Sequence, residues 1–269
     1  MSSFTPDIVR FRKRSILVLT GASLLSATAF LWPFFYSSAN VAQTQLIFWS
    51  AIALAVFLMI VEISNSRLDA KSIALLGILA AIIAALRPLG AGAVGIEPMW
   101  FILILSARVF GASFGFLLGI ISMFASALLT GGMGPWLGYQ IFAAAWIGLM
   151  AGALPKNLRG RTEIIILASF GALASMLFGI LMDLQFWPWA LGSGTQLSYI
   201  PGDQITENIY RFLSFHFLTA MAWDIPRAIF TSTLILITGR SILSALKRTH
   251  TQAAFLAPIT FTQSRIGNR

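Results

Sequence analysis

The chain has no cysteine and only two histidines, His216 and His250, among its 269 residues. The absence of cysteine excludes disulfide bonds and thiolate metal sites, and it leaves two positions for any imidazole ligand. Charged side chains are also scarce, at 10% of residues, whereas soluble domains carry about 25%. This composition is that of a membrane protein and excludes an ordinary soluble domain.

Long apolar runs fill the chain instead, with 58% hydrophobic residues and 22 phenylalanines. A helix of about 20 apolar residues crosses a bilayer. The runs predict an all-α, polytopic membrane helical bundle of eight spans, of which the fourth is short enough to be a tilted or partial helix. The predicted spans are Ser15–Tyr36, Gln45–Val61, Ser72–Leu86, Met99–Phe110, Gly111–Thr130, Pro135–Leu154, Glu163–Met182 and Phe212–Thr238.

The first span has two interpretations. A basic segment ending at Arg14, an apolar core and the small residues Ala27 to Ala29 are typical of a signal peptide and its cleavage site. However, the apolar run continues beyond Ala29 through Trp32 to Phe35. This continuation favours a retained transmembrane helix over a cleaved one.

Two consecutive spans, 111–130 and 135–154, predict a tight helical hairpin. The turn between them contains Gly131, Gly132, Gly134 and Pro135, and such residues permit a sharp reversal and cannot continue a helix. Small residues recur at intervals of four on these helices and on the 163–182 span, which lets helix backbones approach closely in lipid. These residues are Gly111, Gly115, Gly119, Gly148, Gly152, Gly171, Ser175 and Gly179.

The basic residues predict the orientation of the chain. If the eight spans cross the membrane in alternating directions, 15 of the 18 Lys and Arg lie on the same side of the membrane as the N-terminus. The exceptions are Arg87, Arg211 and the intramembrane Arg227. The positive-inside rule makes that side cytoplasmic. We therefore expect a multi-pass plasma-membrane protein with cytoplasmic N- and C-termini, and we read the net charge of +9 as a topology signal, with no nucleic-acid partner.

The predicted outer segments are 89–98, 131–134 and 183–211. The first of these contains Gly90, Gly92 and Gly95, which match the dinucleotide fingerprint in letters but lack the strand and helix that it requires. Aromatic side chains gather in or near the other two, where they either anchor the protein at the membrane interface or line a solute pocket. These aromatic residues are Trp136, Tyr139, Trp187 and Trp189.

The last span contains an intramembrane ion pair. Asp224 and Arg227 are three residues apart, so they can pair on one helix face, and Pro226 kinks the helix between them. Ionised groups within the membrane are costly and are paired or functional. The pair is either a structural ion pair or, together with Trp223, Tyr139 and Gln140, a set of groups that contacts a solute.

Residues from about Ala70 to Arg248 resemble the substrate-binding (S) component of an energy-coupling-factor transporter, a vitamin-uptake class of ABC transporter. The resemblance rests on an ordered set of motifs. They are the overlapping Ala80/Ala84 and Ala81/Ala85 pairs, Ala107-Arg-Val-Phe-Gly111, Thr130-Gly-Gly-Met-Gly-Pro-Trp136, and Trp223-Asp-Ile-Pro-Arg-Ala228 followed by Gly239-Arg240.

The resemblance implies a six-helix core over residues 70–248 that binds a vitamin under its outer loops. It implies docking through Ala80, Ala81, Ala84 and Ala85 on a transmembrane coupling subunit, and toppling driven by two separate ATPases. The glycine-rich turn is similar to that of S components associated with cobalamin uptake. The family pattern has no place for the two spans within residues 1–69, and residues 249–269 form a predicted flexible cytoplasmic tail.

Two other function classes were weighed. A stand-alone secondary transporter or channel would use the Asp224/Arg227 pair for a proton or cation. An intramembrane hydrolase would need a nucleophile with a base or a metal motif, and the chain has neither Gly-x-Ser-x-Gly nor His-Glu-x-x-His. No nucleotide-binding Gly-x-x-x-x-Gly-Lys-Ser/Thr motif occurs either. We therefore expect a non-enzymatic, cofactor-free subunit whose energy comes from partners.

Overall fold

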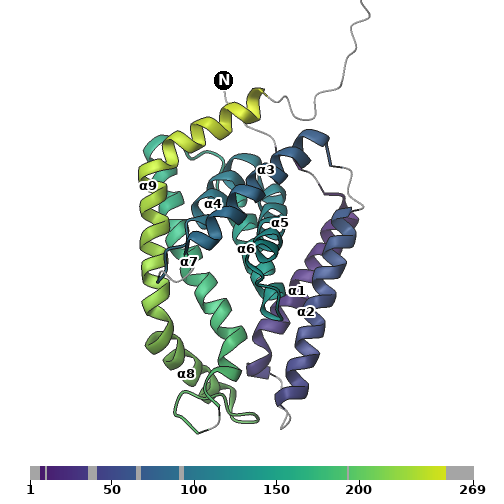
Figure 1. Cartoon of the computed structure of the whole chain (residues 1–269), viewed down its shortest axis with the longest axis vertical. Coiled ribbons are helices and arrows are strands. Elements are labelled where there is room, and N and C mark those ends of the chain that lie inside the picture. The colour runs from purple at the N-terminus through teal and green to yellow at the C-terminus, as the bar shows by residue number, and fades with distance from the viewer. Residues whose placement is uncertain are drawn as a thin grey trace, which may run out of the picture.

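The computed structural model describes residues 7–9, 11–35, 41–64, 68–90, 94–192 and 194–252. Every regular element in this part of the chain is helical (Figure 1). The elements are α1 (Lys13–Phe35), α2 (Val41–Ser64), α3 (Ala70–Leu86), the 3₁₀ turn η1 (Arg87–Gly90), α4 (Met99–Phe110), α5 (Ala112–Thr130), α6 (Trp136–Ala153), α7 (Gly160–Ala190), α8 (Ile205–Phe215), the π-helical turn η2 (His216–Ala220) and α9 (Met221–Gln252).

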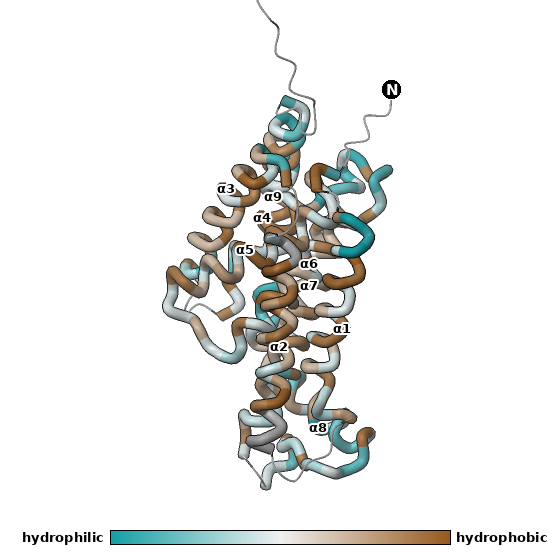
Figure 2. Tube along the Cα trace, turned by 90° about the vertical axis from the view of Figure 1, so that its right-hand side faces the viewer, coloured by the Kyte–Doolittle hydropathy of each residue, from teal (hydrophilic) through white to brown (hydrophobic). Residues whose placement is uncertain are grey.

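Six of the described helices are long and apolar enough to cross a membrane, counting α3 with η1 as one helix and α8, η2 and α9 as another. Two shorter apolar helices, Leu46–Val61 within α2 and α4, fall at the remaining predicted spans. Hydrophobic residues occupy the middle of the long helices, and hydrophilic residues gather towards the two ends of the molecule (Figure 2). The predicted all-α multi-pass membrane bundle is confirmed.

The predicted hairpin is formed by α5 and α6. Gly131 ends α5 in the left-handed conformation (φ 66°), which glycine adopts without steric cost. A side chain on Gly115 or Gly148 would overlap the backbone of the other helix, and one on Gly119 would overlap the backbone at Ala144. The absence of side chains at these positions therefore sets how closely the two helices approach, as close packing in lipid requires.

The small residues of α7 likewise allow α9 to pack closely against it. A Cβ on Gly171 would lie 3.1 Å from the Thr231 methyl group, and Ser175 Oγ lies 3.3 Å from Thr231 Oγ1. The helix ends differ from the prediction, however. α7 continues to Ala190 through Pro188, because Trp187 is buried there and donates a 2.7 Å hydrogen bond to the Leu197 carbonyl oxygen.

The predicted outer segment 183–211 is helical at both ends, since α7 ends at Ala190 and α8 begins at Ile205, and it is not one continuous helix. The helix that contains the last predicted span continues beyond Thr238 to Gln252. The first residues of the predicted cytoplasmic tail, 249–252, are therefore helical. The rest of that tail lies outside the described residues.

The two N-terminal helices lie together along one side of the bundle, with α9 on the opposite side (Figure 1). An aromatic cluster attaches α1 to the core: Trp32 stacks on Trp189 with ring centroids 5.5 Å apart and meets Tyr199 edge-on. Tyr139 of α6 donates a hydrogen bond to the Ala29 carbonyl oxygen (3.3 Å). Of the possible cleavage-site residues, Ala29 is thus buried in the bundle as part of α1, whereas Ala27 is half-buried and Thr28 is exposed.

A buried ion pair joins α4 to α7 at the basic end of the molecule. Arg108 Nε lies 2.9 Å from Glu163 Oε1, and both side chains are at most 5% exposed. Arg108 also donates hydrogen bonds to the Leu154 and Leu158 carbonyl oxygens, and Lys247 reaches the second Glu163 oxygen at 2.8 Å. The loop from α6 to α7 and the end of α9 are thereby tied to the core.

Candidate functional site

The predicted pairing of Asp224 with Arg227 is confirmed, and the pair belongs to a larger ion network. Arg227 Nη1 contacts Asp224 Oδ1 at 2.5 Å on one face of α9, and Arg227 Nε contacts Glu97 Oε1 at 2.9 Å. Trp100 donates to the other Glu97 oxygen at 2.7 Å. The Arg227 guanidinium also lies over the Phe178 ring, 5.4 Å from its centroid, a favourable cation–π geometry.

Glu97 reaches Arg227 because the preceding segment rests directly on α9 at Pro226. Gly95 has a positive φ of 69°, and a Cβ there would lie 2.5 Å from the Trp223 carbonyl oxygen and 2.7 Å from Pro226 Cβ. Pro226 lacks the N–H that would continue the helix ladder. The glycine and the proline together let the 94–98 segment approach α9 closely enough to place Glu97.

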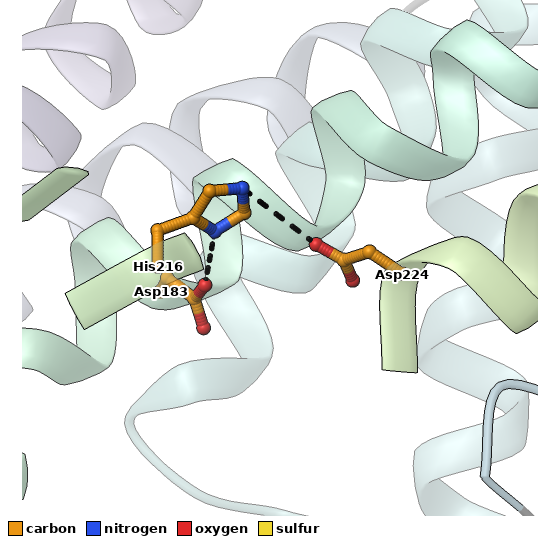
Figure 3. A group of neighbouring side chains, drawn as sticks. All are labelled: Asp183, His216 and Asp224. Carbon is orange, nitrogen blue, oxygen red and sulfur yellow. Dashed lines mark hydrogen bonds and ion pairs between the residues drawn. The ribbon is translucent and has the colours of Figure 1, made fainter. Parts of the chain in front are cut away.

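His216 joins the network from the π-helical turn. In a regular α-helix, residues eight apart point about 80° away from each other at 100° per residue. A π turn takes up one extra residue, which brings His216 and Asp224 to within about 20° of one face. His216 Nε2 accordingly lies 4.0 Å from Asp224 Oδ2, and His216 Nδ1 lies 2.6 Å from Asp183 Oδ2 of α7 (Figure 3).

Asp224 is 2% exposed. Its Oδ1 atom is bound by Arg227, whereas Oδ2 has no hydrogen-bond partner among the described residues and faces His216. Gly179 of α7 provides the space for this carboxylate, because a Cβ at Gly179 would overlap both oxygens. The small-residue spacing on α7 therefore accommodates both α9 and the Asp224 carboxylate.

A cavity of about 290 Å³ adjoins the network and lies between η1, α4, α5, α6 and α7. Arg87 and Glu97 supply its charges, and Trp100 and Phe178 supply its aromatic surface. Arg87 donates to Ser126 Oγ at 2.6 Å and to Gln140 Oε1 at 2.8 Å. Two bonds leave several of the five guanidinium N–H donors available, so the cavity offers cationic, anionic and aromatic groups to one small molecule.

The cavity lies at the glycine-turn end of the α5–α6 hairpin, opposite the basic loop. Gln140 is in the first turns of α6, which runs 18 residues to Ala153, or roughly 27 Å at 1.5 Å per residue. Lys156 follows that far end. The predicted outer segments 89–98 and 131–134 border the cavity through Gly90, Glu97 and the adjacent Thr130.

The predicted solute-binding residues fall into three places. Gln140 lines the cavity, and Asp224 and Arg227 belong to the ion network. Tyr139, Trp187 and Trp189 contact α1 or its neighbouring aromatic residues. Trp136 and Trp223 are 46% and 47% exposed on the surface of the bundle.

The sequence prediction missed Arg87, Glu97, Trp100 and Asp183 as site residues, and it named His216 only as one of two possible imidazole ligands. A signal was present: each charged residue borders or interrupts an apolar run, where an unpaired charge is costly. Their partners could not be inferred, because Glu97 and Arg227 are 130 residues apart in sequence.

The four predicted docking alanines divide between two faces of α3. Ala80 and Ala84 are buried, at 2% and 0% exposure, and α3 packs mainly on α5. Ala81 and Ala85 are exposed on the outer face. Of the two pairs, Ala81 and Ala85 are therefore the ones that another protein's helix can reach.

Comparison with known proteins identifies no relative. No family model matches the chain, and no curated protein or solved structure is significantly similar to it. The function is therefore argued from the site itself.

Proposed function

We propose that this membrane protein is a solute-binding subunit of a transporter, with the cavity at Arg87, Glu97 and Gln140 as its binding site. The observation that carries the proposal is a largely apolar cavity in the helical bundle, lined by two oppositely charged side chains, Arg87 and Glu97. Small-molecule sites are typically apolar and aromatic cavities with a few placed polar groups, and this cavity has that character through Trp100 and Phe178.

The lining favours a small, polar solute that contains a ring. An acceptor group of the solute would accept hydrogen bonds from Arg87, a donor group would pair with Glu97, and the ring would pack against Trp100 and Phe178. The volume of about 290 Å³ is at the lower end of the roughly 300–1,000 Å³ range of ligand sites. It therefore favours a compact vitamin or metabolite over the corrin ring system of cobalamin, the solute predicted from the glycine-rich turn.

The energy source follows from the resemblance to energy-coupling-factor S components. In this proposal the chain delivers its solute through a transmembrane coupling subunit and two ATPases, from outside the plasma membrane towards the cytoplasmic termini. Ala81 and Ala85 would contact the coupling subunit, because they are exposed on α3.

The test is solute binding by the full chain purified in detergent, using a panel that contains thiamin, riboflavin and cobalamin. We expect saturable binding of a compact ring compound that is lost in Arg87→Gln, since the guanidinium is the main cationic donor in the cavity. Arg211→Gln is the matched control: Arg211 pairs with Asp203 (2.6 Å), away from the cavity. Binding unaffected by Arg87→Gln, or absent for every compound, would contradict the assignment of the cavity.

Transport in liposomes separates this proposal from a stand-alone secondary transporter that uses Asp224 and Arg227. The subunit proposal requires that liposomes containing this chain alone bind solute but do not accumulate it. Unaided accumulation that is abolished by Asp224→Asn would replace the subunit proposal with the secondary transporter.

A further inference from the structure

In the histidine cluster, defined as Asp183, His216 and Asp224, a buried Asp224 oxygen without a hydrogen-bond partner among the described residues faces the imidazole ring. The Asp183 carboxylate lies 2.6 Å from Nδ1 of His216, so a neutral imidazole in this site holds its proton on Nδ1 and donates a hydrogen bond to Asp183. The Nε2 lone pair then faces Asp224 Oδ2, which has no hydrogen-bond partner among the described residues.

The side chains of His216 and Asp224 are too buried for bulk water to donate hydrogen bonds to these two acceptor atoms. The His216 side chain is 3% exposed and that of Asp224 is 2% exposed. An unsatisfied buried acceptor is costly, and here two of them meet. A cation between Nε2 and Oδ2 would satisfy both.

The distance between His216 Nε2 and Asp224 Oδ2 indicates which cation fits between them. A shared proton would need a nitrogen-to-oxygen separation of about 2.7–3.0 Å. A transition metal with bonds of about 2.0–2.1 Å to both atoms needs about 3.4 Å in tetrahedral geometry. The observed separation is 4.0 Å, so a metal requires the two side chains to close by about 0.6 Å and a shared proton by about 1.0–1.3 Å.

The surrounding groups suit a divalent ion. The groups joined by the network carry three carboxylates, at Glu97, Asp183 and Asp224, and one guanidinium, at Arg227. The Arg87 guanidinium lies at the same cavity as Glu97, and with a neutral imidazole the carboxylates still outnumber the cations, which favours a bound cation. A metal-bound histidine commonly donates its second ring N–H to a carboxylate that fixes its orientation, and Asp183 is placed to do this.

We propose that the histidine cluster binds a divalent first-row transition-metal ion, with His216 Nε2 and Asp224 Oδ2 as ligands and Asp183 as the positioning residue. Imidazole and carboxylate ligands suit ions such as Zn²⁺ and Co²⁺. Two protein ligands leave coordination positions open for water or for a chelating group. The proposal is independent of the solute assigned to the neighbouring cavity.

The experiment is a Co²⁺ and Zn²⁺ titration of the full chain in detergent, without a histidine tag, by calorimetry and visible absorption. We expect about one ion per chain with nitrogen coordination. His216→Gln should abolish this site, Asp183→Asn should weaken it by about 10- to 100-fold, and His250→Gln should leave it unchanged. Since the chain has only these two histidines, nitrogen coordination has an unambiguous source.

A second measurement keeps the test decisive if a variant does not fold. Wild-type protein loaded with Cu²⁺ should show the electron-spin-echo modulation of a single imidazole nitrogen, and His250→Gln should retain it. Wild-type protein that binds no ion at millimolar concentration, or an imidazole signal that disappears with His250→Gln, would overturn the proposal.

Discussion

Gly179 of α7 lies directly against the Asp224 carboxylate of α9, so closely that a Cβ at this position would overlap both carboxylate oxygens. A helix–helix contact and a buried charge therefore depend on the same missing side chain. Asp224 in turn holds Arg227 and faces His216. The geometry of the ion network is thus coupled to the packing of α7 against α9.

Gly179→Ala tests this coupling. The added methyl group must displace Asp224, and overpacking of this kind costs about 1–3 kcal/mol. We expect a lower melting temperature in detergent and weaker solute binding. The matched control is Gly21→Ala in α1, where a Cβ meets no atom within 4 Å; it should be neutral or stabilising by up to about 1 kcal/mol, because alanine favours a helix over glycine. Equal melting temperatures for the two variants would contradict the coupling.

Glu163→Ala should strongly destabilise the basic end of the bundle. Removing one partner of a buried ion pair leaves an uncompensated charge and costs about 3–5 kcal/mol, and Arg108 is only 4% exposed in its side chain. Thermal or SDS unfolding measures the loss. Glu207→Ala, which removes an exposed carboxylate in the first turn of α8, should cost no more than about 1 kcal/mol.

The two alanine pairs of α3 should respond differently to leucine. Ala81→Leu with Ala85→Leu changes the exposed face, so we expect an intact monomer and lost assembly with the coupling subunit. Ala80→Leu with Ala84→Leu inserts volume into the buried face and should lower the melting temperature of the chain itself. Co-purification and thermal unfolding of both double variants check this. Assembly that survives Ala81→Leu with Ala85→Leu would show that the outer face of α3 is not the docking surface.

Asp203 should make the α8 end of the molecule sensitive to acid. Its Oδ1 atom accepts a hydrogen bond from the Gln204 backbone N–H (2.8 Å) and its Oδ2 atom one from Arg211 (2.6 Å). These two hydrogen bonds hold the Asp203 pKa below its ordinary value, and the bond from the Gln204 backbone has the larger effect. A carboxyl group whose folded pKa is lowered stabilises the fold fully above its unfolded pKa, about 3.9, and loses that contribution as pH falls through the folded value.

Asp203→Asn should therefore lower the melting temperature near neutral pH, and the difference from wild type should shrink as pH falls below about 4. Melting curves of both proteins from pH 7 to about pH 3 measure this. A difference between Asp203→Asn and wild type that is constant across this range would contradict the role of the ionised carboxylate.

The sequence predicted the parts of this fold that depend on local chemistry. Apolar length identified the membrane helices, the glycine-rich turn identified the α5–α6 hairpin, and a spacing of three residues identified the Asp224–Arg227 pair. The helix ends at Ala190 and Gln252 were missed. At the first of these ends, the tertiary contacts of Trp187 outweigh the local effect of Pro188.

The candidate site was predicted only in part, because its contacts are long-range. Gln140 was selected from its place in the hairpin, but its partner Arg87 lies 53 residues away. Tyr139 and Trp189 were expected near a solute, yet they contact α1, a helix that the six-helix pattern does not include. The position of His216 depends on a π turn, which no feature of the residues 216–220 indicated in advance.

The backbone contact between α5 and α6 has a mechanical consequence. Two helices that touch at Gly115 and Gly148 have no intervening side chains to rearrange, so they form a fixed wall of the cavity. For a solute that enters this cavity as proposed, the wall that can move is then the opposite one, formed by η1 and Glu97. That wall is held to the rest of the site by polar bonds from Arg87 and Arg227, which a competing ligand can exchange one at a time.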